Sequence, residues 1–424
     1  MVKTEYPRIG ETVLSETLPN GLRVCVVPKP GYRKRYAFFA TRYGGMDMRF
    51  RLRGVWQDTP AGIAHYLEHK MFDTEDGNAL QTLAQNGAEP NAFTANSMTA
   101  YYFDCTERFE ENLRILLSFV SVPYFTQESV DKERGIIAQE IRMTEDSPDW
   151  RVYKNLLQCL YRTNPARVPI VGTVESIAEI TADTLYACHK VFYAPSNMVL
   201  CVEGDVDPEA VARIAEELLP AERAPIPAAD LGPDEGLLPA APLVRAQMEV
   251  SAPQFLIGVK LDPGARGEDA LRRRLVATLA MRMLCGASSP FFSRLYEQGL
   301  LNMDFDYEVD ASAGTLLAIV GGESRNPDEV LAAFRAECTR IADEGFDEAL
   351  FTRARRASLG ARLRGLEDFD NVCVSLAGGV FDGFCALDAF RLLEGVTRED
   401  CRRFVEENLT AERMAMSIIE AKKV

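Results

Sequence analysis

The chain has 424 residues, of which 47% are hydrophobic and 26% are charged, and its formal net charge is -16. This length exceeds one ordinary core and fits two or three domains. The acidic balance excludes a nucleic-acid partner, because phosphate binding needs clustered Lys and Arg. Residues 1–10 do not resemble a signal peptide, and no stretch approaches the roughly 20 apolar residues that span a bilayer. We therefore expect a cytoplasmic protein without a membrane partner.

The first half of the chain predicts a mixture of strands and helices. Periodicity favours strands at residues 21–27, 36–43 and 99–105, and helices at 60–72, at 110–120 and through Glu140. A further strand at 198–203 leads through Asp207 and Pro208, a helix cap and a first-turn proline, into another helix.

A segment rich in proline and alanine, residues 220–242, interrupts this periodicity and reads as an interdomain linker. It separates two expected domains, residues 1–219 and 243–424. The second half predicts strands at 254–261 and 315–320, a helix near 272–284 and a helix that opens at residues 326–327.

The two halves resemble each other in element order, and residues 125–145 match residues 346–368 best. In that register Ala354 stands opposite Glu133, and Ala361 stands opposite Glu140. We infer an internal duplication in which only the first copy kept acidic chemistry. The predicted fold class is α+β, with two similar α/β-roll domains that each pack helices on an antiparallel-rich sheet.

Two of the three histidines lie in the segment His65-Tyr-Leu-Glu68-His69. Residues 58–60 (Asp-Thr-Pro) predict a capped helical start, and on that helix both imidazoles and the carboxylate share one face. Two imidazoles one turn apart can hold a zinc ion, and a carboxylate between them can deprotonate a water. The pattern H-x-x-E-H is the inverted zincin signature. The alternative is a solvated helix face.

A third ligand must come from elsewhere, because catalytic zinc usually has three protein ligands and one open position. The predicted helix that runs through residue 140 offers Glu133 and Glu140, two turns apart on one face. One can bind the metal while the other orients a ligand. Spacing alone leaves open which of them does which.

Three blocks in this order, residues 65–69, 91–103 (NAFTANSMTAYYF) and 132–140 (KERGIIAQE), resemble the active-site half of the insulinase/pitrilysin peptidases. Residues 28–31 and 62–72 look most like a bacterial branch of that family. The resemblance implies one zinc ion per chain held by His65, His69 and Glu140. It also implies that Glu68 is the general base and Glu133 a carboxylate that orients a ligand.

By the same resemblance, Asn91, Ala92, Phe93 and Thr94 form an edge strand to which an extended peptide adds by main-chain hydrogen bonds. The alternative is an ordinary interior strand. The third histidine, His189, has no second ligand spaced with it and is expected to be structural.

The implied activity is zinc-dependent endopeptidase cleavage of oligopeptides or unfolded segments by a zinc-activated water, inside an enclosed chamber. Two alternatives stay open. One is a specialised maturation or leader peptidase in a peptide- or protein-modification pathway. The other is a non-catalytic scaffold or peptide-binding subunit.

Self-sufficient members of the family carry an Arg and a Tyr in the second half that reach into the active site. The matching positions here hold Tyr296 and Asn302, with Arg294 and Tyr307 as nearby candidates. This departure predicts a heterodimer in which a homologous, zinc-less subunit supplies the Arg and Tyr. A homodimer with a relocated donor is the alternative.

Overall fold

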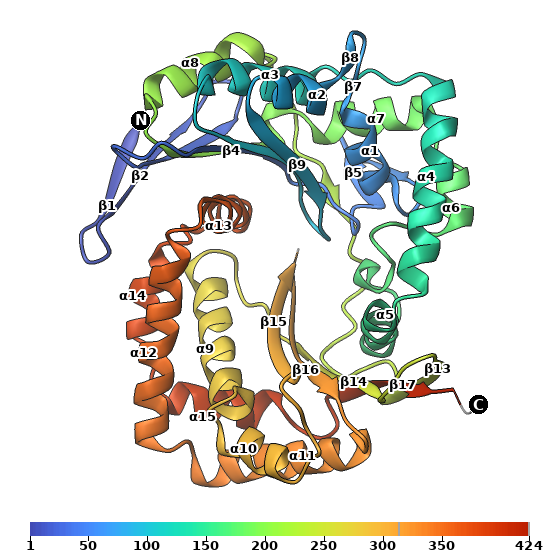
Figure 1. The fold of residues 1–424 in the computed structure, drawn as a ribbon, viewed down its shortest axis with the longest axis vertical. Coiled ribbons are helices and arrows are strands. Elements are labelled where there is room, and N and C mark those ends of the chain that lie inside the picture. The colour runs from blue at the N-terminus through green and yellow to red at the C-terminus, as the bar shows by residue number, and fades with distance from the viewer. Residues whose placement is uncertain (313, 423–424) are drawn as a thin grey trace.

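The computed structural model describes residues 1–312 and 314–422 and shows two halves that face each other (Figure 1). In the first half, one sheet has the order β1-β2-β3-β11-β4-β10-β9, and all its neighbours are antiparallel except β3 and β11. Its strands are β1 (Val2–Tyr6), β2 (Glu11–Thr17), β3 (Arg23–Pro28), β4 (Arg35–Thr41), β9 (Ala88–Thr94), β10 (Thr99–Cys105) and β11 (Met198–Gly204).

The second half contains a five-stranded sheet with the order β13-β17-β14-β16-β15. This order repeats β3-β11-β4-β10-β9, including the parallel pair, which is now β13 with β17. The strands are β13 (Leu243–Met248), β14 (Gln254–Leu261), β15 (Asp306–Ser312), β16 (Thr315–Glu323) and β17 (Met414–Ala421). The repeated topology confirms the predicted fold class of two similar α/β rolls.

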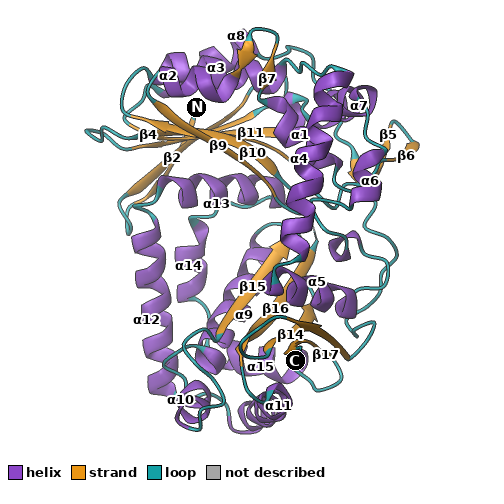
Figure 2. Cartoon of the chain, turned by 45° about the vertical axis from the view of Figure 1, so that its right-hand side comes forward, coloured by secondary structure: helices purple, strands orange, loops and turns teal. Residues whose placement is uncertain are grey.

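The helices also repeat in order between the halves, except the last helix of the first half, which has no counterpart among the described residues. Figure 2 shows the helices of both halves. Those of the first half are α1 (Ile63–Met71), α2 (Ala79–Gln85), α3 (Phe109–Ser121), α4 (Gln127–Glu145), α5 (Pro148–Leu160), α6 (Val174–Ala178), α7 (Ala182–Phe192) and α8 (Pro208–Leu218). Those of the second half are α9 (Glu268–Cys285), α10 (Pro290–Glu297), α11 (Pro327–Glu344), α12 (Glu348–Gly365), α13 (Phe369–Asp382), α14 (Asp388–Glu394) and α15 (Arg398–Asn408).

Short elements complete the described chain. They are the hairpin strands β5 (Arg49–Leu52) and β6 (Val55–Asp58), the pair β7 (Asp73–Thr74) and β8 (Gly77–Asn78), the strand β12 (Ala228–Ala229), and the 3-10 turns η1 (Pro165–Arg167) and η2 (Pro195–Asn197). The β12 strand lies within the predicted linker and pairs with β5, so that linker also contributes to a small sheet.

Each sheet buries one face against helices of its own half and the other face against a helix of the opposite half. Helix α5 packs on β14 and β17, and α13 packs on β4 and β11. The approach of α5 is so close that a Cβ at Gly258 would lie 2.9 Å from Leu156 Cδ2. Glycine at that strand position lets the helix and the sheet touch.

Two sequence expectations need correction. Residues 58–60 do not cap a helix, because Asp58 ends β6 and α1 begins only at Ile63. The residue before α1 is Gly62, with φ 89°, and a Cβ there would lie 2.7 Å from the carbonyl oxygen of Val171. A left-handed glycine packed against that carbonyl therefore sets the helix start.

Contrary to expectation, the stretch Glu268–Glu297 is long and apolar enough, by length and composition, to cross a membrane. It comprises α9 and α10, and 67% of its apolar window is buried inside the protein. Burial against β15, β16 and the neighbouring helices explains its hydropathy as that of core helices.

The linker is fastened to the first half through Glu235. Its carboxylate accepts hydrogen bonds from the backbone N–H groups of Arg162, Thr163 and Asn164 at 2.6–2.7 Å and from the Thr163 hydroxyl at 2.8 Å. Partial burial would raise the pKa of Glu235, but these donors lower it to about 2.

We expect Glu235→Ala to lower the free energy of unfolding by about 1–2 kcal/mol at pH 7, since the side chain is partly exposed and screened. The folded pKa lies below the ordinary value of 4.5, so this stabilisation is present above pH 4.5 and disappears as the pH falls toward 2. Urea unfolding and amide exchange at residues 162–164 measure it. The control is Glu222→Ala, at an exposed position of the linker. Equal amide exchange at residues 162–164 in the two variants would contradict the role of Glu235.

Candidate metal centre

Helices α1 and α4 bring the predicted ligands together. Helix α1 buries Tyr66, Leu67 and Met71 in the first core. The Tyr66 hydroxyl donates a hydrogen bond to the carbonyl of Val130 in α4. This contact fixes the two helices against each other, with His69 only partly buried at their junction.

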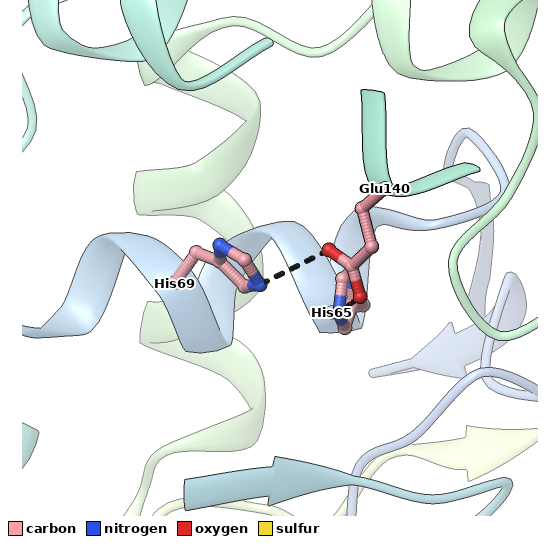
Figure 3. A group of neighbouring side chains, drawn as sticks. All are labelled: His65, His69 and Glu140. Atoms are coloured by element: carbon pink, nitrogen blue, oxygen red, sulfur yellow. Dashed lines mark ion pairs between the residues drawn. The ribbon is translucent and has the colours of Figure 1, made fainter. Parts of the chain in front are cut away.

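His65, His69 and Glu140 converge with all three candidate ligand atoms within 4.8 Å of one another (Figure 3). The carboxylate of Glu140 lies 3.5 Å from His65 Nε2 through one oxygen and 3.6 Å from His69 Nε2 through the other. A tetrahedral zinc ion with ligand bonds of about 2.0–2.1 Å separates its ligand atoms by roughly 3.3 Å. The donor set and its spacing therefore fit a zinc ion.

Glu133 lies on the other side of the His69 ring, and its Oε1 is 3.0 Å from His69 Nδ1. With the proton assigned to Nδ1, the imidazole donates to Glu133 and leaves Nε2 for a metal. This hydrogen bond holds the pKa of Glu133 below its usual range. Burial lowers the pKa of His69, but the hydrogen bond to Glu133 and the charges of Glu68, Glu133 and Glu140 raise it by more. The pKa of His69 therefore lies above its ordinary value. His65 hydrogen bonding likewise lowers the pKa of Glu140.

The two imidazoles differ in their support. The Nδ1 atom of His65 is buried and has no hydrogen-bond partner within the described ranges. Of the two rings, only His69 has a carboxylate partner at Nδ1, the nitrogen that points away from Glu140, and Glu133 supplies it.

The side chain of Thr94 donates a 2.6 Å hydrogen bond to Glu68 Oε2. The Thr99 hydroxyl lies 3.4 Å from that of Thr94 and donates to the Tyr43 carbonyl at 2.8 Å. Sequence reasoning placed Thr94 in a substrate-binding strand and missed its contact with Glu68. No spacing signal could have found it, because the contact joins a helix to a strand 26 residues later.

Strand β9, which carries residues 91–94, lies at the edge of its sheet and pairs only with β10 among the described strands. The interior-strand alternative is therefore wrong. Ala92, Phe93 and Thr94 line the pocket beside the histidines, whereas Asn91 does not. Its side-chain oxygen instead accepts a hydrogen bond from the backbone N–H of Ala92.

The pocket at the metal cluster has a volume of about 500 Å³. Besides the predicted residues, it is lined by Trp150, Tyr153 and Lys154 of α5 and by residues 166–171. Lys154 Nζ lies 4.5 Å from the Trp150 ring centroid, and the Tyr153 hydroxyl donates to Asp310 of β15 at 3.2 Å. These residues carry no motif, so sequence reasoning missed them.

None of the second-half candidates for the family's Arg and Tyr lines this pocket. Arg294 forms an ion pair with Glu337 at 3.3 Å, and Tyr296 is 48% exposed. Both lie on α10, at the end of the second half away from α1 (Figures 1 and 2). An arginine that does line it is Arg167, of the first half.

The remaining histidine stands apart from the metal cluster. His189 is buried in α7, and its Nε2 donates to the Val120 carbonyl at 2.9 Å. Burial lowers the pKa of His189 to about 4. The ring is thus a neutral packing residue.

Comparison with known families assigns this arrangement to a class of peptidases. The profile of the insulinase family, peptidase family M16, matches residues 54–174, which contain the metal cluster. The profile of the peptidase M16 inactive domain matches residues 179–358. The chain belongs to the M16 insulinase family of peptidases, which confirms the family predicted from the three sequence blocks.

Within the family, the chain is 36% identical over 419 residues to YmfH, an uncharacterized zinc protease of Bacillus subtilis, with 97% of each chain covered. It is 29% identical to the uncharacterized zinc protease SCO5738 of Streptomyces coelicolor, which covers 87% of this chain and 80% of the relative. An M16-like peptidase from Alicyclobacillus acidocaldarius has a crystal structure with a TM-score of 0.92 and 33% identity, covering 99% of this chain and 100% of that one. The match to YmfH confirms the expected bacterial branch.

We expect purified protein to hold about one zinc ion per chain, Glu140→Gln to lose most of it, and Glu133→Ala to weaken zinc binding roughly 10–100-fold. The first change removes a ligand, and the second removes the acceptor that orients His69. Metal analysis and titration against a competing chelator measure both. Glu128→Ala, an exposed residue on the first turn of the same helix, is the control. A greater loss with Glu133→Ala than with Glu140→Gln would show that their roles are exchanged.

Proposed function

We propose that this chain is the zinc-carrying subunit of an endopeptidase that hydrolyses oligopeptides or unfolded segments. One observation carries the proposal: two imidazoles and one carboxylate converge at ligand distances, with a further carboxylate, Glu68, one residue from a ligand on the same helix. Three protein ligands are the usual set of a catalytic zinc site that keeps an open position. A purely structural role needs no such additional carboxylate in a pocket.

His65, His69 and Glu140 would hold the ion, and zinc in such a site would polarise a carbonyl and lower the pKa of water. Glu68 accepts the proton of the attacking water and then returns it to the leaving amine. The hydrogen bond from Thr94 keeps one oxygen of Glu68 occupied and holds the carboxylate in place. Glu133 keeps the His69 ring in the orientation that ligation requires.

The edge position of β9 supports recognition of an extended peptide. Its outer edge has no strand partner in the described part of the chain, so its backbone groups can pair with a peptide. Ala92, Phe93 and Thr94 line the pocket, which places this edge beside the metal cluster. Main-chain pairing constrains substrate conformation more than sequence, which supports unfolded or short substrates.

We expect Glu68→Gln to keep zinc and the fold but to lose peptide hydrolysis by about 100-fold or more, because the amide preserves shape and removes the base. Cleavage of a quenched fluorescent peptide, together with zinc content and circular dichroism, checks this. Near-normal turnover in this variant would exclude Glu68 as the base. Glu89→Gln, at an exposed position of β9, is the matched control.

We further propose that a homologous subunit without the H-x-x-E-H segment supplies the Arg and Tyr that stabilise the developing oxyanion. The support is that Arg294, Tyr296, Asn302 and Tyr307 all lie outside the metal pocket. The rival is a homodimer with a relocated donor. Arg167 is the candidate for that donor because it lines the pocket and its Nε is buried without a partner among the described residues, although its Nη1 donates to the Arg162 carbonyl.

The isolated chain should have at most about 1% of the activity that it shows with a co-expressed zinc-less homologue, since one lost oxyanion donor costs roughly 10²–10³ in kcat. Peptide cleavage by the chain alone, by the homologue alone and by the mixture measures this. If the isolated chain were fully active and Arg167→Gln abolished that activity, Arg167 would be the donor. The proposal that a second subunit supplies the Arg and Tyr would then be wrong.

A further inference from the structure

The second half contains a cavity at the position equivalent to the metal pocket. The metal pocket lies among α1, α4, α5 and β9, and the repeated element order makes α9, α12, α13 and β15 their counterparts. These four elements line a cavity of about 390 Å³, which is continuous in its lining with a smaller cavity of about 270 Å³ between α9 and α12. Ala361, the counterpart of Glu140, lines the smaller one.

The two cavities of the second half, together called the arginine cavity, are lined by groups of the opposite charge to the carboxylates of the metal pocket. Arg274, Arg282 and Arg362 line it, and no aspartate or glutamate is found in its lining among the described residues. Arg274 is neutralised by an ion pair with Asp382. The guanidinium groups of Arg282 and Arg362 form no hydrogen bond or ion pair with any residue of the described ranges.

Both of these arginines are half-buried, and Arg362 is shielded enough for burial to lower the pKa of its guanidinium. A guanidinium nevertheless stays charged in a protein, so its burial without a counter-ion is costly. Beside it, the hydroxyl of Ser358 is buried and has no hydrogen-bond partner within residues 1–312 and 314–422. Two unpaired guanidinium groups and a hydroxyl without a partner in one cavity are groups that bind an anion.

Strand β15 connects this cavity with the metal pocket. Successive side chains of a strand point to opposite faces. Asp310 accepts a hydrogen bond from Tyr153, which lines the metal pocket, whereas Val309 and Ala311 line the arginine cavity. The metal pocket and the arginine cavity therefore lie on opposite sides of one edge strand, β15.

We propose that the cavity among α9, α12 and α13 is an anion subsite in which Arg282, Arg362 and Ser358 bind a carboxylate of a peptide held at the metal pocket. The inference rests on the proposed peptidase function, because it assigns that site a preference for acidic segments. The net charge of the chain is -16, so its overall electrostatic field repels an acidic peptide. Tighter binding of the acidic form must therefore come from a local site.

The test compares two labelled, unstructured peptides of about ten residues, which span roughly 33 Å when extended. One ends in Glu-Glu with a free C-terminus, and its neutral twin ends in Gln-Gln-amide. Binding is measured by fluorescence anisotropy on the full-length, zinc-loaded Glu68→Gln chain, so that no turnover is needed. We expect the acidic peptide to bind about tenfold more tightly, and the Arg282→Gln/Arg362→Gln variant to abolish that difference. Arg356→Gln, at an exposed position of α12, should preserve it.

Equal binding of the two peptides, or an equal loss of both in the double variant, would overturn the subsite. Arg362→Lys keeps the charge and provides a second measurement if the double variant does not fold. It should retain part of the preference for the acidic peptide.

Inorganic phosphate is another anion that the same groups would bind. Protection of the wild-type chain against thermal unfolding by phosphate, with no acidic preference among peptides, would assign the cavity to phosphate and refute the peptide. A chain that never hydrolyses a peptide but shows the acidic preference would refute only the proposed activity.

Discussion

The exchange of helices between the two halves is the constraint on which the rest of the structure depends. A sheet with apolar side chains on both faces must be covered on both. Each half supplies helices for only one face of its own sheet, and the second face is covered by α5 in one case and α13 in the other. Neither half covers both faces of its sheet alone, so the two halves are packed as one unit although a proline-rich segment joins them.

This exchange also places the metal pocket. Helix α5 follows α4 after only two residues, so the helix that carries Glu133 and Glu140 ends where the covering helix of the other sheet begins. The hydrophobic side of α5 holds the second sheet, while Trp150, Tyr153 and Lys154 face the histidines. The contact of Tyr153 with Asp310 then brings β15 to the same pocket. A metal site built by residues of the first half is thereby bordered by the second.

Local sequence patterns predicted part of this arrangement, whereas features that depend on tertiary contacts could not be predicted. The repeated element order could be predicted, and so could the meeting of His65, Glu68, His69 and Glu140 in one pocket, because helical periodicity and ligand chemistry are local or pairwise properties. Roles that arise from tertiary contact could not be predicted: the support of Glu68 by Thr94, the pocket wall from α5, and the start of α1 at a left-handed Gly62. Sequence spacing also left open which of Glu133 and Glu140 binds the metal and which orients a ligand. In the structure Glu133 contacts the Nδ1 side of His69, and Glu140 contacts the Nε2 sides of both rings.

The two halves show how one framework can hold opposite charges at equivalent places. In the first half, α4 presents two carboxylates toward α1, and the histidines and a cation can balance them. In the second, alanines replace both carboxylates, and the space is lined by arginines from α9 and α12. Among the described residues no carboxylate lines this space, so none there neutralises the guanidinium groups of Arg282 and Arg362. The second half thus has a cavity beside the same kind of edge strand, and its charge is of the sign that attracts the carboxylates of a peptide.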